Sequence, residues 1–246
     1  MIAKVPGFTE KMESTAKMLD VKDLRAGYGQ SEVIHGVSFA AKKSEIVAIM
    51  GRNGMGKTTL FKAVMGILPA KTGAVTVDGV DITALPSYRR VIQGVAYVPQ
   101  GRMIFPNLTV WENILTGLEG SPTRKLPEDI FSLFPVLAEM RARKGGNLSG
   151  GQQQQLAIAR ALAASPKVLL LDEPTEGLQP SIIKDIATVL LRVRDSRQLT
   201  ILVSEQVLSF TMGIADRLLV VEGGKLTTDE PRENVDMDRM KRLLAV

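Results

Sequence analysis

The chain has 246 residues, 45% hydrophobic and 23% charged, a composition that fits a globular protein with one sizeable core. The absence of cysteine excludes a disulfide framework, a zinc finger and a thiol nucleophile. A formal net charge of +5 is mild for this length, so we expect general surface charge and no nucleic-acid partner. His35 is the single histidine, which excludes any mechanism that needs two imidazoles.

Neither membrane insertion nor secretion is predicted. The longest apolar runs, such as 168–171 and 201–203, are far shorter than the roughly 20 residues that cross a bilayer. The N-terminus lacks the apolar core of a secretory signal, so we expect a cytosolic chain. Residues 1–17 show no periodicity and are expected to form a flexible leader, with the folded domain over 18–246.

The first part of the domain predicts antiparallel strands and then a strand, a loop and a helix. Apolar and polar residues alternate over 37–41 and over 75–77, and a turn-forming Asp-Gly pair follows the second run. The continuous apolar run 46–50 favours a strand that is covered on both faces. A helical pattern of apolar residues follows over 60–68.

The middle of the chain, about 101–160, predicts an inserted helical subdomain. Thr109 and Glu112 are spaced as a capping box at a helix start, and Pro127 suits the first turn of another helix.

The last part alternates strands and helices. The pattern predicts strands over 168–171, 200–203 and 217–221. Helices are predicted over 182–193 and from about 206, and that order indicates a parallel sheet with helices on both sides. A hairpin and an amphipathic helix are predicted over about 223–246, the helix patterned by Val235, Met240 and 243–244.

A glycine-rich loop between the strand 46–50 and the next helix has the spacing of a phosphate-binding loop. Its candidate nucleotide ligands are Gly51, Asn53, Gly54, Gly56, Lys57, Thr58 and Thr59. Backbone amides can surround a β-phosphate there, and the helix N-terminus adds its positive dipole. Lys57 can reach the β and γ oxygens, and Thr58 offers a hydroxyl to Mg²⁺. The alternative is a glycine-rich turn without this role.

An acidic pair ends the predicted strand 168–171. Asp172 is expected to hold Mg²⁺, directly or through water, and Glu173 to act on the attacking water as a general base or orienting group. An aspartate that only caps the next helix is the alternative.

A second glycine-rich helix start precedes that strand and comprises Ser149, Gly150, Gly151 and Gln152. A capped helix alone would also explain Ser149. Together with the phosphate loop, and with Gln100 closing the segment 95–99, this motif resembles the nucleotide-binding subunit of an ABC transporter over about 18–221.

The resemblance implies an α/β fold: a P-loop NTPase cassette with a mixed sheet core, a small antiparallel β subdomain and an inserted helical subdomain. It implies a head-to-tail pair of cassettes, with ATP and Mg²⁺ between the phosphate loop of one chain and residues 149–152 of the other. Ser149 and the amides of Gly150 and Gly151 would contact the γ-phosphate across the interface. Gln100 would contact Mg²⁺ and pass the motion to membrane permease subunits.

Tyr28 fits the adenine-stacking aromatic of the family, and a buried structural tyrosine is the alternative. Two positions depart from the family pattern. Gln206 stands where a histidine usually contacts the γ-phosphate, so we expect a catalytic role for Gln206 with weaker transition-state stabilisation. Gln179 replaces the usual aspartate after the glutamate, which puts communication between subunits at that point in doubt.

The runs 98–106, 149–156, 174–181 and 205–206 resemble importers of branched-chain amino acids and urea, and 134–137 and 150–156 are closest to the urea-type subunit. This resemblance implies a peripheral subunit on the cytoplasmic face of the inner membrane and an extracytoplasmic solute-binding protein. It favours a related heterologous cassette as partner, and a second copy of this chain is the alternative. A branched-chain amino acid importer and a soluble cassette protein not coupled to transport are the alternatives. Glu173 argues against a third, a module that senses ATP without hydrolysing it.

Overall fold

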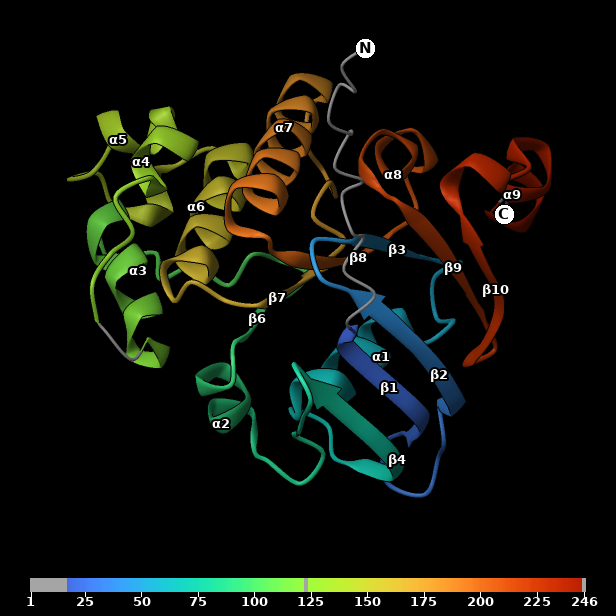
Figure 1. Ribbon diagram of the computed structural model, residues 1–246. Coiled ribbons are helices and arrows are strands. Elements are labelled where there is room, and N and C mark those ends of the chain that lie inside the picture. The colour runs from blue at the N-terminus through green and yellow to red at the C-terminus, as the bar shows by residue number, and fades with distance from the viewer. Residues whose placement is uncertain (1–16, 122–123, 245–246) are drawn as a thin grey trace, which may run out of the picture.

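The structure, a computed structural model, describes residues 17–121 and 124–244. The leader predicted over 1–17 lies outside the described residues except for Lys17, with which the first strand begins. Figure 1 shows a helical region on one side of the molecule, two sheets in its middle, and the C-terminal hairpin and helix on the other side.

Within the described residues, the larger sheet has six strands in the order β10-β9-β3-β8-β7-β6. In that order the strands span Lys225–Pro231, Arg217–Glu222, Ile46–Met50, Thr200–Glu205, Val168–Asp172 and Val95–Val98. All neighbouring strands are parallel except the β9–β10 hairpin, so the predicted mixed sheet is confirmed. The parallel strands place their carboxyl ends along one edge, where loops can carry a site.

The smaller sheet is antiparallel, and among the described residues its order is β2-β1-β4-β5. The strands span Ile34–Lys42, Lys17–Ala26, Ala70–Val77 and Val80–Asp81. Val21 of β1 lies opposite Phe39 of β2 on one side and Val75 of β4 on the other. The apolar residues of the alternating pattern therefore lie on the buried face of this sheet, and the prediction of antiparallel strands is confirmed.

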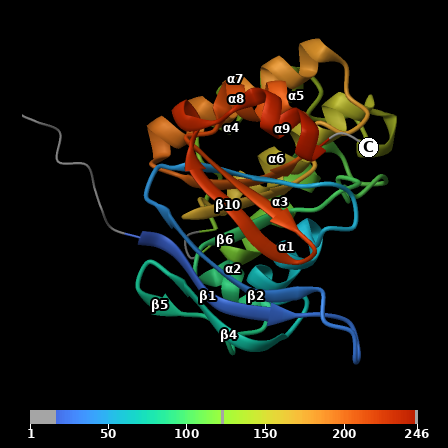
Figure 2. The same ribbon diagram turned by 90° about the vertical axis from the view of Figure 1, so that its right-hand side faces the viewer.

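The two faces of the larger sheet cover separate cores. Ala48 of β3 packs into one core with helices α6 (Gly150–Ala163), α7 (Pro180–Arg197) and α8 (Leu208–Ile214), whereas Ile49 packs into the other. The second core also holds α1 (Lys57–Met65) and the smaller sheet. Figure 2 shows these layers, with the smaller sheet on one side of the larger one and α7, α8 and α9 on the other.

Short helices form the helical region. They are α3 (Val110–Thr116), α4 (Ile130–Leu133) and α5 (Pro135–Glu139), with 3-10 turns η1 (Gly117–Gly120) and η2 (Gly145–Asn147). Helix α2 (Ser87–Ile92) lies apart from these three helices and contacts β6 (Figure 1). The predicted capping box is confirmed, because Thr109 Oγ1 accepts from Glu112 N at 3.1 Å and Thr109 N donates to Glu112 Oε2 at 2.7 Å. The prediction for Pro127 is wrong, since α4 starts only at Ile130; Pro135 takes the first position of α5 instead.

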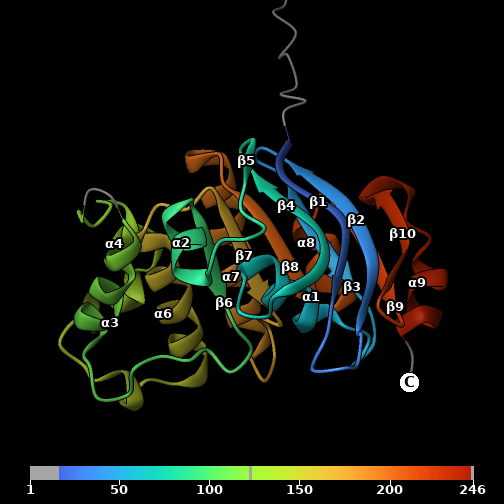
Figure 3. The same cartoon turned by 90° about the horizontal axis from the view of Figure 1, so that it is seen from below.

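Several predicted helix boundaries move. The helix predicted over 60–68 ends at Met65 because Gly66 adopts a left-handed conformation with φ 72°. Val235 precedes the last helix, α9 (Met237–Leu244), and follows the turn η3 (Arg232–Asn234). Met240 of α9 is fully buried and fastens the helix to the core. In the view from below, α9 and the β9–β10 hairpin lie at the side of the molecule opposite α3 and α4 (Figure 3).

Candidate active site

The phosphate loop connects the end of β3 to the start of α1, as predicted. Gly51, Gly54 and Gly56 all have positive φ, at 155°, 78° and 107°. A Cβ on Gly51 would lie 2.5 Å from the carbonyl oxygen of Val221, and one on Gly56 would lie 2.8 Å from the Ile34 side chain. The close contacts and the left-handed conformations therefore require glycine at these positions.

A cavity of about 340 Å³ opens beside this loop. It is lined by Val33, Asn53, Gly54, Gly56, Lys57, Thr58, Thr59, Gln100 and Glu173. The structure thus brings four separate parts of the sequence to one cavity: the loop before β2, the phosphate loop with the start of α1, the loop after β6 and the end of β7. We call this cavity the phosphate pocket.

Lys57 occupies the centre of the site and is 4% exposed. Its Nζ donates to the carbonyl oxygens of Gly51 at 2.7 Å and Arg52 at 3.2 Å, and lies 3.5 Å from Glu173 Oε1. The loop carbonyls hold the ammonium group in the phosphate pocket, where it can neutralise an anion.

Glu173 follows β7 and has φ 48°, a left-handed conformation that costs a non-glycine residue about 1–2 kcal/mol. Its side chain accepts from two amides: Gln206 Nε2 at 3.0 Å on Oε1 and Gln100 Nε2 at 3.2 Å on Oε2. The carboxylate is thereby aimed into the phosphate pocket, where it can accept a proton from water.

Asp172 lies one residue earlier and is 1% exposed. Ser204 Oγ donates to its Oδ1 at 2.6 Å, and the Tyr97 hydroxyl donates to its Oδ2 at 3.1 Å. Neither partner belongs to the next helix, so the helix-cap alternative is contradicted. Burial and the neighbouring Asp172 raise the pKa of the Tyr97 hydroxyl above its ordinary value, which keeps the phenol protonated and able to donate.

Gln206 joins the phosphate loop to the carboxylate. Its Nε2 donates to Asn53 Oδ1 at 2.7 Å as well as to Glu173. His35 cannot fill this position, because it lies in β2 of the smaller sheet, where its Nδ1 is 3.0 Å from Glu32 Oε1.

Gln100 has a second acidic partner that sequence reasoning missed. Its Nε2 donates to Glu176 Oε2 at 3.1 Å as well as to Glu173. Carboxylate oxygens only accept hydrogen bonds, so the amide nitrogen must face both of them and Oε1 stays free for another ligand.

Tyr97 and Ser204 were also missed by sequence reasoning. Both contact Asp172 from neighbouring strands, β6 and β8, so no spacing along the chain indicates them. Alternation within each predicted strand would reveal at most which face of the sheet they occupy.

Tyr28 and the second glycine-rich motif lie outside the phosphate pocket. Tyr28 is 50% exposed, which contradicts the alternative of a buried structural tyrosine. Ser149 and Gln152 form a capping box at the start of α6, with Gln152 N donating to Ser149 Oγ at 3.4 Å and Ser149 N to Gln152 Oε1 at 2.9 Å. Gly150 and Gly151 form the first turn of that helix, and none of the four residues lines the phosphate pocket of its own chain.

The described part of the chain contains no helix with both the length and the apolarity needed to cross a bilayer.

Comparison with known proteins identifies the family. Residues 34–176 match the family model of the ABC transporter. The high-affinity branched-chain amino acid transport ATP-binding protein BraG of Pseudomonas aeruginosa is 37% identical over 212 residues, which cover 85% of this chain and 91% of that protein. The lipopolysaccharide export system ATP-binding protein LptB of Haemophilus influenzae is 34% identical, over 92% of this chain and 96% of that protein.

A solved structure shows the same fold. The crystal structure of a nucleotide-free ATP-binding cassette from an ABC transporter superposes with a TM-score of 0.79 and 26% identity, covering 94% of this chain and 96% of the other. The chain therefore belongs to the ABC transporter family and is an ATP-binding and ATP-hydrolysing cassette.

Proposed function

We propose that the chain is the motor subunit of an ABC importer. The observation that carries the proposal is the contact of Glu173 with both other residues: its Oε1 lies 3.5 Å from Lys57 Nζ and 3.0 Å from Gln206 Nε2. Lys57 would bind the β and γ oxygens of ATP, Glu173 would accept the proton of the attacking water, and the Gln206 amide would contact the γ-phosphate.

Mg²⁺ fits the donors that surround the phosphate pocket. Thr58 supplies a hydroxyl and Gln100 the free Oε1 of its amide, and both residues line the pocket. Asp172 is a carboxylate just behind it whose two oxygens already accept hydrogen bonds, which favours a link to the metal through water. These are oxygen donors, the ligands that Mg²⁺ prefers. When bound, the ion would neutralise charge on the β and γ oxygens.

The remaining half of the site would come from a second cassette. Ser149, Gly150, Gly151 and Gln152 at the start of α6 lie outside their own phosphate pocket, where a head-to-tail pairing needs them. The α6 N-terminus would present amides and a positive dipole to the γ-phosphate of the partner's ATP. Tyr28 is exposed beside the smaller sheet, where it can stack on adenine. The importers that the sequence resembles usually pair two different cassettes, so we propose a related heterologous partner.

A groove of about 620 Å³ on the helical side supports coupling to membrane permease subunits. Its rim carries the exposed apolar side chains of Ile67, Tyr88, Ile92, Met103 and Phe105. We call it the docking groove. The loop after β6 supplies both Gln100 in the phosphate pocket and Phe105 in the docking groove, so a permease segment seated there would contact the loop that reaches the nucleotide. The chain would then be a peripheral subunit on the cytoplasmic face of the membrane.

The solute is proposed to be urea, taken up by way of an extracytoplasmic binding protein. Residues 134–137 and 150–156 carry the resemblance to urea-type subunits. The likeness to BraG favours branched-chain amino acids as the second candidate.

The test is uptake of labelled urea and leucine by cells that lack this gene, restored with wild type or with Lys57→Ala. Restoration of urea uptake by wild type and not by Lys57→Ala supports the proposal. Loss of leucine uptake alone assigns the chain to the branched-chain amino acid importers. If neither uptake changes, a role in importing these two solutes is excluded. An export function, as in the similar protein LptB, or a cassette not coupled to transport would then be favoured.

A further inference from the structure

Tyr97 connects the docking groove with the carboxylate behind the phosphate pocket. Its side chain is among those that line the docking groove, and its hydroxyl donates to Asp172 Oδ2 at 3.1 Å. A single side chain in β6 therefore contacts both the surface available to a partner and a carboxylate at the end of β7.

The position of the Tyr97 ring is fixed on its inner side. The ring stands edge-on against Phe61 of α1, with an interplanar angle of 89° and centroids 6.5 Å apart. Phe61 is fully buried and belongs to the helix that starts at Lys57. The ring therefore has a packed neighbour on the α1 side and borders the docking groove with part of its surface.

Asp172 depends on this hydroxyl for its orientation. Ser204 Oγ holds Oδ1 from β8, and Tyr97 holds Oδ2 from β6. Both donors are protein groups, and the carboxylate is 1% exposed, so water replaces neither of them without a rearrangement. Loss of one donor would let the carboxylate turn away from the orientation in which it would hold Mg²⁺ through water.

We propose that Tyr97 is a positioning residue that transmits occupancy of the docking groove to Asp172 and thereby sets the affinity of the site for Mg²⁺. The proposal rests on the proposed function for the metal and for the groove. It adds a second connection between the docking groove and the metal site, which runs through Tyr97 in strand β6, to the connection through the loop that carries Gln100. A segment that enters the docking groove would shift the ring, stretch the hydrogen bond to Asp172 and weaken the hold on Mg²⁺.

The first test measures Mg²⁺ binding with Tyr97→Phe, which removes the hydroxyl and keeps the ring. Binding of a fluorescent ATP analogue to the purified chain is followed as Mg²⁺ is titrated, and binding in EDTA reports the metal-free affinity. We expect the Mg²⁺ concentration at half-saturation to rise about threefold, as the loss of one hydrogen bond predicts, with the EDTA value unchanged. Tyr88→Phe is the matched control, because Tyr88 also lines the docking groove, is 63% exposed, and no hydrogen bond links it to Asp172 in the described structure.

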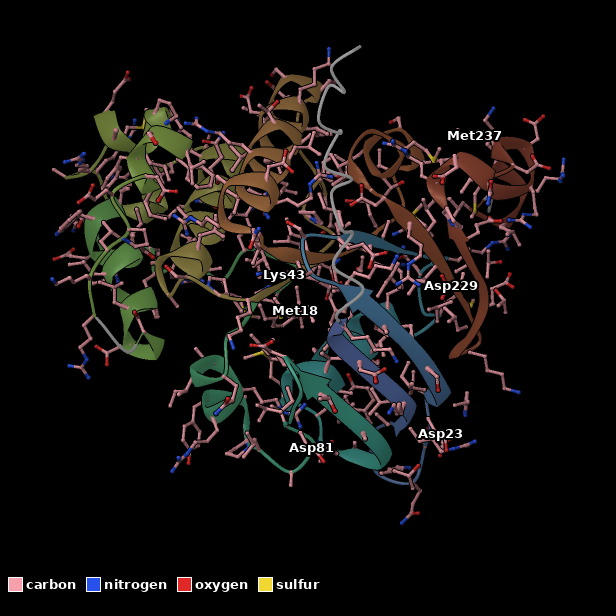
Figure 4. All side chains as sticks on the ribbon, viewed as in Figure 1. Met18, Asp23, Lys43, Asp81, Asp229 and Met237 are labelled. Atoms are coloured by element: carbon pink, nitrogen blue, oxygen red, sulfur yellow. The ribbon has the colours of Figure 1, made fainter. Side chains whose placement is uncertain are left out.

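The second test fills the docking groove with a probe. Because the chain has no cysteine, Ile92→Cys can be labelled with pyrene maleimide at one site in the groove wall, where Ile92 is 52% exposed. We expect the label to raise the Mg²⁺ half-saturation about threefold in the chain with Tyr97 and to leave it unchanged in the Tyr97→Phe background. Met237→Cys is the control, because Met237 lies on α9 at the far side of the molecule (Figure 4).

An equal shift with and without the Tyr97 hydroxyl overturns the proposal, as does no shift in either background. If Tyr97→Phe does not fold, ¹⁹F spectra of the unaltered sequence carrying fluorotyrosine give a second measurement. The chain has three tyrosines, and the signal assigned to Tyr97 must respond both to Mg²⁺-ATP and to the label at position 92. These measurements use the isolated chain, so a failure of the importer proposal in uptake experiments remains distinguishable from a failure here.

Discussion

The Gln206 amide nitrogen lies 3.0 Å from Glu173 Oε1 and 2.7 Å from Asn53 Oδ1, so one side chain joins the carboxylate that would activate water to the phosphate loop. An amide can donate these hydrogen bonds but cannot carry a positive charge. The site therefore has the position that the family usually gives to histidine but lacks its charge.

The first prediction concerns that charge. Gln206→His should raise the ATP hydrolysis rate at saturating ATP about tenfold, because an imidazolium beside the γ-phosphate stabilises charge that develops in the transition state. Steady-state phosphate release in the assembled complex measures it, with Gln206→Ala as the control that removes the donor. An unchanged rate would show that the amide stabilises the transition state as well as the imidazole does.

The second prediction concerns the general base. Glu173→Gln should lower hydrolysis at least about a hundredfold, since it removes the proton acceptor and keeps the shape. ATP binding should remain, and cassette pairs should accumulate with uncleaved ATP, measured by light scattering with the partner cassette present. Glu176→Gln is the matched control, because Glu176 also accepts from Gln100 but is not placed beside Lys57. Equal losses from both substitutions would contradict the assignment of Glu173.

The third prediction concerns Glu205, which is 3% exposed and closes the turn after Asp172. Its Oε2 accepts from Thr175 N and Oγ1, at 3.3 and 2.6 Å, and its Oε1 accepts from the amides of Gln206 and Val207. Glu205→Ala should lower the free energy of unfolding by about 3 kcal/mol, because buried donors lose their acceptor. Urea denaturation measures this, with the exposed Glu222→Ala as control. If Glu205→Ala lowers the free energy of unfolding no more than Glu222→Ala does, water must replace Glu205 as acceptor for the donors of this turn.

The fourth prediction concerns a contact between the phosphate loop and the C-terminal helix. Arg52 Nε donates to the carbonyl oxygen of Leu243 in α9 at 3.0 Å, and Gly224 N donates to Met55 O at 3.1 Å. Arg52→Ala should weaken ATP binding several-fold with little change in melting temperature, because the loop loses a support that lies at the surface. A chain that ends at Arg242 should show the same weakening, with no further loss when the two changes are combined. Additive losses would mean that Arg52 acts on the nucleotide directly.

The fifth prediction concerns acid stability at the start of α9. Hydrogen bonds from the backbone amides of Arg239 and Asp238 hold the pKa of Asp236 below its ordinary value. A carboxyl with a lowered folded pKa stabilises the protein above its unfolded pKa of about 3.9 and loses that contribution as the pH falls through the folded value. The protection of α9 amides relative to their intrinsic exchange rates should therefore fall below about pH 4, and Asp236→Asn should remove this pH dependence. The same dependence in both chains would contradict the assignment.

Local rules accounted for most of the elements. The alternation over 37–41, the continuous apolar run 46–50 and the Thr109–Glu112 capping box each appear as predicted, because backbone geometry and burial act over a few residues. The prediction that Pro127 starts a helix was wrong, because the fixed φ of proline suits a first helical turn and equally suits the loop in which Pro127 lies.

The spacing of Gly51 and Gly56 with Lys57 and Thr58 was enough to predict a phosphate loop on a strand-loop-helix unit. Positive φ favours glycine at 51, 54 and 56, and close contacts also require it at 51 and 56. Which side chains contact Asp172, Glu173 and Gln100 follows from the packing of the folded chain. Tyr97, Ser204 and Glu176 come from separate segments, and parallel strands bring them together through hydrogen bonding between strands. Spacing along the chain carries no record of that pairing, so those contacts had to be seen in the folded molecule.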